Sequence, residues 1–296
     1  MSNHSRRIGF VGTGIMGGHM ARRLAEAGFP VMAWNRSSAK SEALGAYGVS
    51  QASQAAQIGR DVDVVICMLS SGPVCDEVLF GTGGVAAAMA PGSILVVMSS
   101  IPVDTARNQA VRAGQKGIRY VDAPVSGGEA GAREGTLAIM AGCDEDLVGE
   151  LAPILAHLGR VTHVGPAGSG SLAKLANQLI VASNICAVAE ALLLAERGGA
   201  SPARVREALS GGFADSTVFR QHGRRMIESD FAPGGPAKYQ IKDTGTALEL
   251  AGSLGLHLPV ATEVDRIFRG LVEHGGGDLD HSAAILELRR LNSGVQ

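Results

Sequence analysis

Charge and cysteine chemistry are both sparse in this chain of 296 residues. Charged side chains make up 18% of it, the formal net charge is −2, and no stripe of lysine and arginine stands out. Proteins that bind nucleic acid or an anionic membrane need such a basic surface, so we expect neither partner. The four cysteines form no C-x-x-C pair and follow no disulfide-module spacing. We therefore expect free thiols in a reducing cytoplasm, with Cys67, Cys143 and Cys186 in apolar surroundings.

Long uninterrupted apolar runs are also missing, although apolar residues make up 46% of the chain. No apolar signal-peptide core follows the polar stretch of residues 1–7, which again favours the cytoplasm. The most apolar long segment, residues 172–195, carries Lys174, Asn177 and Gln178, which a membrane span would not readily accommodate. We expect a buried helix of a globular protein there, in a chain long enough for about two domains.

Short β-branched runs alternate with helical stretches in the first half of the chain. This alternation predicts the α/β class, with a doubly wound, mostly parallel sheet of the Rossmann type. The expected helices are residues 16–27, 38–47, 74–79 and 104–114. The expected strands are residues 8–11, 31–34, 64–68, 94–98, 120–122, 137–140 and 161–164.

A glycine-rich break, residues 165–170, ends this pattern, and almost no strand signal follows it. Residues 172–197 predict one long interdomain helix, closed by Gly198 and Gly199. Further helices are expected at residues 202–209, 219–227, 241–254, 260–272 and 282–291. We therefore expect an α/β domain over residues 1–166 and an all-α domain over residues 167–296.

The first expected strand runs directly into a G-x-G-x-x-G loop, Gly12-Thr13-Gly14-Ile15-Met16-Gly17. Gly12 would permit a tight turn, Gly14 would let the backbone approach phosphates, and Gly17 would let helix and strand pack closely. A pyrophosphate would then lie at the helix N-terminus. The chain has 41 glycines, so the motif is informative because of its place between strand and helix. It predicts a dinucleotide-binding domain over residues 1–166.

The end of the second expected strand indicates which dinucleotide is bound. Enzymes that use NAD hold a carboxylate there, about 20 residues after the glycines. This chain has Asn35-Arg36-Ser37 instead. Arg36 could pair with a 2′-phosphate, Ser37 could donate to it, and Lys40 lies one helical turn further on. The pattern predicts a preference for NADP(H), with NAD(H) as the alternative if Arg36 is an ordinary solvated arginine.

Three further segments carry chemistry that needs an explanation. Residues 122–128, Asp-Ala-Pro-Val-Ser-Gly-Gly, follow a strand, and their small side chains leave backbone N–H groups for an anion. Lys174, Asn177 and Gln178 share one face of a helix at spacings of three and four. Lys242-Asp243 lies in the all-α half. Taken singly, each has an ordinary explanation as a solvated lysine or a surface ion pair.

Taken together, these segments make the chain similar to the β-hydroxyacid dehydrogenase family over essentially its whole length. The family's tartronate semialdehyde branch is the most similar, through residues 122–129, 174–182, 211–218 and 280–283. The matching family motifs are the glycine loop, Met98-Ser99-Ser100, residues 122–128, Gly135-Thr136-Leu137, residues 174–178 and Lys242-Asp243.

The resemblance implies an NAD(P)H-dependent reduction of a small carboxylate-bearing aldehyde, in the leading case tartronate semialdehyde to glycerate. Lys174 would be the proton donor to the carbonyl, where an ammonium also stabilises developing negative charge. The implied substrate-binding residues are Ser126, Gly127, Gly128, Asn177, Gln178 and Lys242. The implied cofactor contacts beyond the glycine loop and residues 35–37 are Met68, Leu69, Ser99, Ser100 and Lys242.

Several alternatives stay open at this stage. Many relatives have asparagine four residues after the lysine, whereas this chain has Gln178 there and Asn177 one residue earlier, so either amide could face the substrate. The other substrates of the family to consider are 3-hydroxyisobutyrate, L-serine and threonate. The candidates for the pocket wall that selects among them are Phe213, Ser216, Thr217, Phe219 and Tyr239. A catalytically silent dinucleotide-binding scaffold is a second class, against which the lysine with its amides argues.

We expect neither 6-phosphogluconate dehydrogenase activity nor a metal site. Val181 stands where 6-phosphogluconate dehydrogenases place a glutamate, seven residues after the lysine, and the all-α half is far shorter than theirs. The eight histidines are scattered and no pair has a metal-ligand spacing with a carboxylate, so we expect no metal.

We do expect a homodimer or tetramer, because the family forms both and a small apolar helical domain often pairs with a copy.

Overall fold

The computed structural model describes residues 6–294, and the chain divides after Lys174 into two compact units. The polar stretch considered above therefore lies largely outside the described residues, which leave out 1–5. The long helix that links the two units belongs in part to each. The expected domain boundary after residue 166 stays a prediction.

The first unit, which ends at Lys174, is built on a nine-stranded sheet in the order β3-β2-β1-β4-β5-β6-β8-β7, with β9 paired to β8. All strand pairs are parallel except β6–β8 and β7–β8. The predicted doubly wound, mostly parallel sheet is confirmed, and the first six strands have the order of a Rossmann fold. The strands are β1 Ile8–Val11, β2 Val31–Trp34, β3 Ser50–Gln51, β4 Val64–Cys67, β5 Ile94–Val97, β6 Arg119–Asp122, β7 Val125–Ser126, β8 Leu137–Gly142 and β9 Gly159–Gly165.

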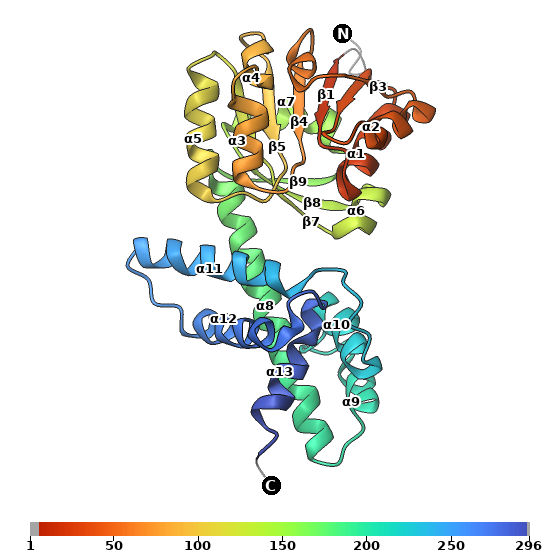
Figure 1. Cartoon of the computed structure of the whole chain (residues 1–296), viewed down its shortest axis with the longest axis vertical. Helices are drawn as coiled ribbons and strands as arrows, with labels where there is room; N and C mark the ends of the chain where they lie inside the picture. The colour runs from red at the N-terminus through yellow and green to blue at the C-terminus, as the bar shows by residue number, and fades with distance from the viewer. Residues whose placement is uncertain (1–5, 295–296) are drawn as a thin grey trace. The chain divides into compact units, whose positions relative to one another are not determined.

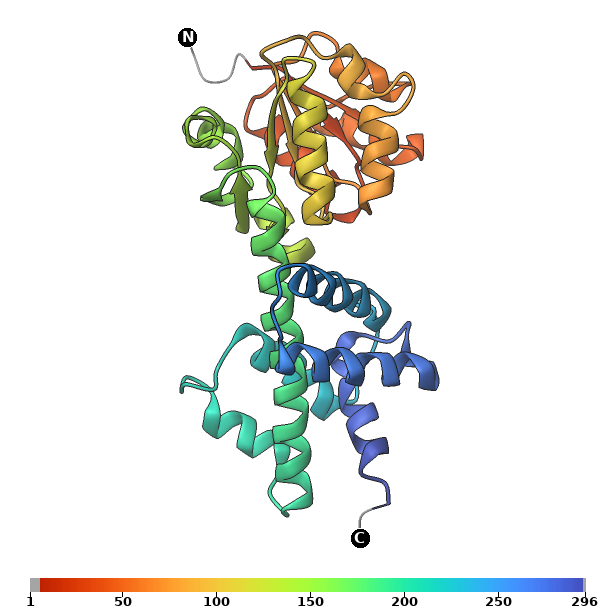
Figure 2. The same cartoon turned by 90° about the vertical axis from the view of Figure 1, so that its left-hand side faces the viewer.

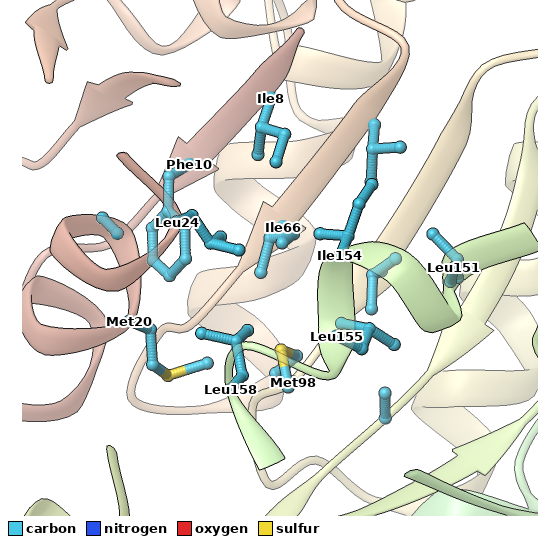
Figure 3. Close-up of a cluster of buried hydrophobic side chains, with 14 of the residues drawn as sticks. Ile8, Phe10, Met20, Leu24, Ile66, Met98, Leu151, Ile154, Leu155 and Leu158 are labelled. Atoms are coloured by element: carbon cyan, nitrogen blue, oxygen red, sulfur yellow. The ribbon is translucent and has the colours of Figure 1, made fainter. Parts of the chain in front are cut away.

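Helices cover both faces of this sheet (Figure 1). On one face, α1 and α7 pack against Ile8, Phe10 and Ile66, whose side chains meet those of the helices in Figure 3. On the other face, α3, α4 and α5 pack against the alternate residues, such as Val65 and Val97, because successive strand side chains point to opposite faces. The helices are α1 Ile15–Glu26, α2 Ser38–Glu42, η2 Ala43–Tyr47, η3 Ala55–Gly59, α3 Gly72–Phe80, α4 Val85–Ala88, α5 Val103–Gly114, α6 Gly128–Glu134 and α7 Glu145–Leu155.

Some elements of this unit were not predicted from the sequence. Helix α7 has Pro153 in its interior, and α6 contains Gly128 and Gly131 and is capped by Gly127 and Gly135. Proline and glycine are residue types that usually end a helix. Strands β3 and β7 have two residues each, too few to show a period. The expectation of buried free thiols is confirmed for all four cysteines, Cys75 included.

The second unit, from Leu175 onward, is all helical, as predicted. Figures 1 and 2 show its shorter helices gathered around α8, which supplies Ala182, Ile185 and Ala189 to the core. Residues of α10, α12 and α13, such as Phe268, complete that core. The helices are α8 Ser169–Arg197, α9 Pro202–Leu209, α10 Thr217–Glu228, α11 Ala237–Ser253, α12 Pro259–Leu271, the π-turn η4 Val272–Gly276, η5 His281–Ala283 and α13 Ala284–Leu291.

Within the described residues, α8 alone is long and apolar enough to cross a membrane by length and composition. Core helices pass the same test, and α8 contributes buried residues to the core of its unit. Its polar residues Lys174, Asn177 and Gln178 are half-buried. These features agree with the expectation of a buried helix.

Candidate active site

The glycine loop follows β1 and opens α1 at the carboxyl end of the sheet. Gly12 has a φ of +93°, and a side chain there would clash with the carbonyl oxygen of Met68. A side chain at Gly17 would clash with the carbonyl oxygen of Gly12, so α1 lies directly on the loop. At Gly14 a Cβ would meet nothing within 4 Å. The loop therefore has tight backbone packing on its inner side and open space where a phosphate would approach.

Asn35 connects this loop to the segment after β2. The backbone N–H of Thr13 donates to Oδ1 of Asn35 at 3.1 Å, and Nδ2 of Asn35 donates to the carbonyl oxygen of Ser37 at 3.1 Å. Arg36, Ser37 and Lys40 are exposed. Asn35 is thus occupied by the backbone, which leaves Arg36 and Ser37 as the groups of this segment that are available to a cofactor.

The adjoining strands β4 and β5 end at the same edge of the sheet. The N–H of Met68 donates to the carbonyl of Val11 at 2.8 Å, which brings the end of β4 beside the glycine loop. The N–H of Leu69 donates to Oγ of Ser99 at 2.7 Å, and Ser99 is fully buried. Ser99 therefore supports the Met68-Leu69 segment, while Ser100 beside it is half-buried. Ligands of doubly wound sheets bind at this edge.

The glycine loop shows two features that fit a dinucleotide pyrophosphate. Oγ1 of Thr13 is buried and has no hydrogen-bond partner among the described residues. Ile15, the first residue of α1, is 71% exposed although it is a large apolar side chain. An unsatisfied hydroxyl and an exposed apolar side chain beside an open glycine are what a bound cofactor would cover.

The proposed anion-binding turn lies in the same unit. Ser126 ends β7 and pairs with Ala138 of β8, so part of its backbone is used by the sheet. Gly127 and Gly128 follow with φ values of +132° and +61°, which only glycine adopts easily, and α6 begins at Gly128. Both glycines are exposed. The turn thus offers the backbone of Gly127 and Gly128 more freely than that of Ser126.

Asp122, which the sequence analysis left without a role, binds the start of α8. It is fully buried at the end of β6. Its Oδ1 accepts from the N–H of Gly168 and its Oδ2 from the N–H of Ser171, both at 2.7 Å. Burial raises the pKa of this carboxyl, while the two backbone N–H groups act in the opposite direction. Lys174 is half-buried one turn further along α8.

The remaining substrate candidates lie in the second unit and form a chain of contacts there. Nδ2 of Asn177 donates to Oε1 of Gln178 at 2.9 Å, and Nε2 of Gln178 donates to Oδ2 of Asp243 at 2.8 Å. The ammonium of Lys242 lies 3.3 Å from the other oxygen of Asp243, with half of its side chain exposed. Asp243 therefore holds both Gln178 and Lys242. Asn177 is the last residue in this series of contacts.

The residues considered for a pocket wall differ in their surroundings. Phe219 is buried in the core of its unit, and Oγ of Ser216 accepts from the N–H of Phe219 as the N-cap of α10. These two residues have structural roles. Phe213 and Tyr239 are exposed, and Thr217 opens α10.

One cluster within residues 6–294 has metal-binding side chains close together, namely His222, Asp280 and His281. The carboxylate of Asp280 already accepts from the N–H groups of three residues and from a hydroxyl, and a guanidinium nitrogen of Arg225 lies 3.4 Å away. That cation would repel a metal ion, so the cluster fits a structural role. Burial and the neighbouring His222 lower the pKa of His281 to about 4.

Comparison with known proteins covers both halves of the chain. The family described as the NAD binding domain of 6-phosphogluconate dehydrogenase matches residues 7–165. The family described as the NAD-binding region of NADP-dependent 3-hydroxyisobutyrate dehydrogenase matches residues 168–288. Together they span nearly the whole chain.

Among curated relatives, 2-hydroxy-3-oxopropionate reductase of Escherichia coli is 44% identical over 95% of this chain and 97% of its own. The 2-(hydroxymethyl)glutarate dehydrogenase of Eubacterium barkeri is 35% identical over 95% and 94%. Among solved structures, 3-hydroxyisobutyrate dehydrogenase of Mycobacterium tuberculosis with L-serine superposes with a TM-score of 0.88 at 31% identity, covering 96% of this chain and 99% of its own.

Proposed function

Because this chain belongs to the β-hydroxyacid dehydrogenase family, whose members are NAD(P)-dependent oxidoreductases acting on CH–OH groups, we propose that it reduces tartronate semialdehyde to glycerate. Tartronate semialdehyde is 2-hydroxy-3-oxopropionate. The Escherichia coli reductase named for that compound is 44% identical to this chain over nearly the full length of both. Tartronate semialdehyde is a small aldehyde with a carboxylate, so its site needs an anion-binding group and a proton donor.

The observation that best supports the proposal is a structural connection between the proposed proton donor, Lys174, and the proposed anion-binding turn. Asp122 joins the start of α8, on which Lys174 lies, to the strand that leads into Ser126, Gly127 and Gly128. The glycine loop lies in the same unit. A proton donor, an anion-binding turn and a dinucleotide loop in one compact unit are what an aldehyde reductase needs.

The nicotinamide cofactor supplies the hydride when it is bound. The glycine loop would hold its pyrophosphate, with the open side of Gly14 and the unsatisfied hydroxyl of Thr13 toward it. Nζ of Lys174 would donate a proton to the aldehyde oxygen as negative charge develops there. An ammonium group offers three N–H donors, which is the chemistry that the reducing direction needs.

The proposed preference for NADP(H) rests on the end of β2. No carboxylate lies there to bind a ribose 2′-hydroxyl, and the exposed guanidinium of Arg36 is free of ion pairs within the described residues. A guanidinium pairs with phosphate through two parallel hydrogen bonds. NAD(H) is the second cofactor to test.

On the substrate side, we propose that Asn177, Gln178 and Lys242 lie near the bound aldehyde, with Asn177 as the amide that reaches it. Gln178 is held by Asp243, which supports a positioning role for the glutamine. Lys242 has half of its side chain exposed and can serve substrate or cofactor.

We further propose a cytoplasmic homodimer or homotetramer. Ile180 and Val260 are 62% and 65% exposed, and they line an apolar groove of about 440 Å³ between α8 and the start of α12. Apolar surface of this kind is usually covered in the assembled protein. The four free cysteines suit a reducing compartment.

The test is oxidation of NADPH and NADH with a panel of aldehydes: tartronate semialdehyde, methylmalonate semialdehyde, succinic semialdehyde and glyoxylate. We expect the highest kcat/KM with tartronate semialdehyde and NADPH. A higher value for methylmalonate semialdehyde, or for L-serine or threonate in the oxidising direction, would assign another substrate of the family. Absence of turnover with every compound would favour a silent dinucleotide-binding scaffold.

A further inference from the structure

Asp122 lies between two groups that the proposed reaction needs at a constant separation. It ends β6 four residues before Ser126, and its carboxylate binds the N–H of Ser171, three residues before Lys174. One path from the anion-binding turn to the proton donor therefore runs through this side chain, beside the path through β8 and β9.

The path is rigid on the side of the turn. The N–H of Ala123 donates to the carbonyl of Val97 at 2.7 Å, and the N–H of Met140 donates to the carbonyl of Pro124 at 3.0 Å. Ser126 is then paired with β8. The backbone from Asp122 to Ser126 is thus attached to neighbouring strands along its length.

The path is equally constrained on the side of the helix. A side chain at Gly142 would clash with Oδ1 of Asp122, and a side chain at Gly170 would clash with the carbonyl oxygens of Asp122 and Met140. Glycine at both positions lets the first turn of α8 lie directly against the ends of β6 and β8. The helix start therefore has little freedom to shift while the carboxylate is in place.

The chemistry of this contact calls for a carboxylate. Both oxygens accept from N–H groups, and a negative charge at the N-terminus of a helix is favourable. An asparagine would offer one acceptor oxygen and would turn its NH₂ group toward the other donor. A fully buried carboxylate is unfavourable by itself, so the position needs this group for more than filling space.

On the basis of the proposed function, we propose that Asp122 is a positioning residue for the reduction. Its carboxylate sets the separation between Nζ of Lys174 and the turn Ser126–Gly128 that would hold the substrate carboxylate. Among the described residues, neither the glycine loop nor Arg36 shares a hydrogen bond or ion pair with Asp122, so we expect cofactor binding to change little when Asp122 is replaced.

The first test is Asp122→Asn, assayed with tartronate semialdehyde and NADPH. A displacement of the donor by a fraction of an ångström to one ångström lowers kcat by about 10- to 100-fold. We expect that loss in kcat, with KM for NADPH within about twofold of the wild-type value because the cofactor loop is untouched. The matched control is Asp144→Asn, because Asp144 precedes α7 without a side-chain hydrogen bond and is exposed.

A double-mutant cycle with Lys174→Ala separates positioning from general damage. If Asp122 acts through Lys174, Asp122→Asn changes the residual kcat of the Lys174→Ala enzyme by less than about threefold. Equal fold-losses in both backgrounds would overturn the inference, because the two residues would then act independently. If Asp122→Asn does not fold, Ser171→Pro replaces it in the cycle, since proline in a first helical turn removes one of the two N–H donors.

Amide hydrogen exchange supplies a readout that needs no substrate. We expect the N–H groups of Gly168 and Ser171 to exchange faster in Asp122→Asn, and unchanged exchange would overturn the inference at once. A wild-type enzyme that is inactive on the whole aldehyde panel would contradict the proposed function, and this inference with it. An active wild-type enzyme with an additive cycle would contradict the role of Asp122 alone.

Discussion

Arg36 is the residue on which the proposed cofactor preference depends. Asn35 beside it is held by the N–H of Thr13 and by the carbonyl of Ser37, so it shapes the segment that presents the guanidinium. The same position would hold the ribose-binding acid in an NAD enzyme. We therefore propose that a supporting amide, Asn35, and an exposed charge, Arg36, set the preference for NADP(H).

We expect Arg36→Ala to raise KM for NADPH by about 10- to 100-fold, because a charge-assisted pair with phosphate is worth about 1.5 to 3 kcal/mol. KM for NADH should change by less than about threefold, since NADH has no 2′-phosphate. Steady-state kinetics with both cofactors provide the measurement. Arg60→Ala is the control, because Arg60 is an exposed arginine of the same unit far along the chain from this segment. Equal losses for both cofactors would contradict the account.

Asn35→Asp tests the same segment by adding a negative charge instead of removing a positive one. An aspartate can still accept from the N–H of Thr13, but it loses the donation to Ser37 and places a negative charge next to the proposed 2′-phosphate. The ratio of kcat/KM for NADPH to that for NADH should fall by about tenfold or more, since repulsion and loss of the supporting bond act together. An unchanged ratio would place the 2′-phosphate elsewhere.

At the scale of the element, the contact between α1 and the glycine loop decides how the cofactor site is built. Two neighbouring glycines of α1 differ in what a side chain would meet. A Cβ at Gly17 would clash with the carbonyl oxygen of Gly12, whereas a Cβ at Gly18 would lie 3.7 Å from that of Thr13, an ordinary contact. Alanine substitutions at these two positions therefore distinguish the effect of helix propensity, which both share, from the effect of close packing, which only Gly17 has.

Gly17→Ala should push α1 away from the loop and lower the free energy of unfolding by about 1 to 3 kcal/mol, the usual cost of overpacking. NADPH affinity should fall with it, since the helix N-terminus moves from the pyrophosphate. Gly18→Ala should keep affinity and stabilise the protein by about 0.5 to 1 kcal/mol, as alanine does in a helix interior. Thermal unfolding and cofactor titration of the two variants test this. Similar behaviour of both would refute the packing argument.

How much of these elements could be predicted from the sequence depends on the signal each carries. The alternation of strands and helices, the glycine loop and α8 have strong local patterns, and the structure confirms them as fold features. The sequence analysis did not predict helix α7, because a proline such as Pro153 usually indicates the end of a helix. In the structure the helix continues through it. The packing of Leu151, Ile154 and Leu155 against the sheet holds that helix, and packing of this kind is not visible in a local window.

The candidate site shows the same division. The glycines, Lys174 and the turn at Ser126 could be named as site candidates from the sequence, because their residue types are unusual in a motif of known spacing. The contacts of Asp122 with Gly168 and Ser171 could not, because they join residues about 50 positions apart through side-chain-to-backbone bonds. The link from Gln178 to Asp243 is likewise a tertiary contact. Sequence patterns thus identify chemical groups more readily than the groups that hold them in place.

At the scale of the whole molecule, stability should depend on pH through the helical unit. His281 lies in a cluster with His222, Asp280 and Arg225. Burial lowers its pKa to about 4, with smaller contributions from His222 and Arg225, while Asp280 acts in the opposite direction. A histidine of this kind is neutral in the folded protein and binds a proton more readily once unfolded. Its contribution is fully present above the ordinary pKa of about 6.5 and is lost as the pH falls toward 4.

We therefore expect the free energy of unfolding to decline between pH 6.5 and pH 4, by up to about 3 kcal/mol from this residue. His281→Gln should remove most of that slope, although it costs stability at every pH because the ring is packed against His222. His257→Gln is the control, because His257 is exposed in the same unit. Calorimetry across this pH range gives the measurement, and an unchanged slope in the His281 variant would assign the acid sensitivity to other groups.

In the proposed reaction, Lys174 donates the proton as NADPH reduces tartronate semialdehyde. The most direct measurement compares kcat and the Kd for NADPH in the wild-type protein and in Lys174→Ala. General acid catalysis contributes about 10²- to 10⁴-fold, so we expect a loss of kcat in that range with Kd within about threefold of the wild-type value. Near-normal turnover in Lys174→Ala, with tartronate semialdehyde as substrate, would remove Lys174 from the mechanism and contradict the account.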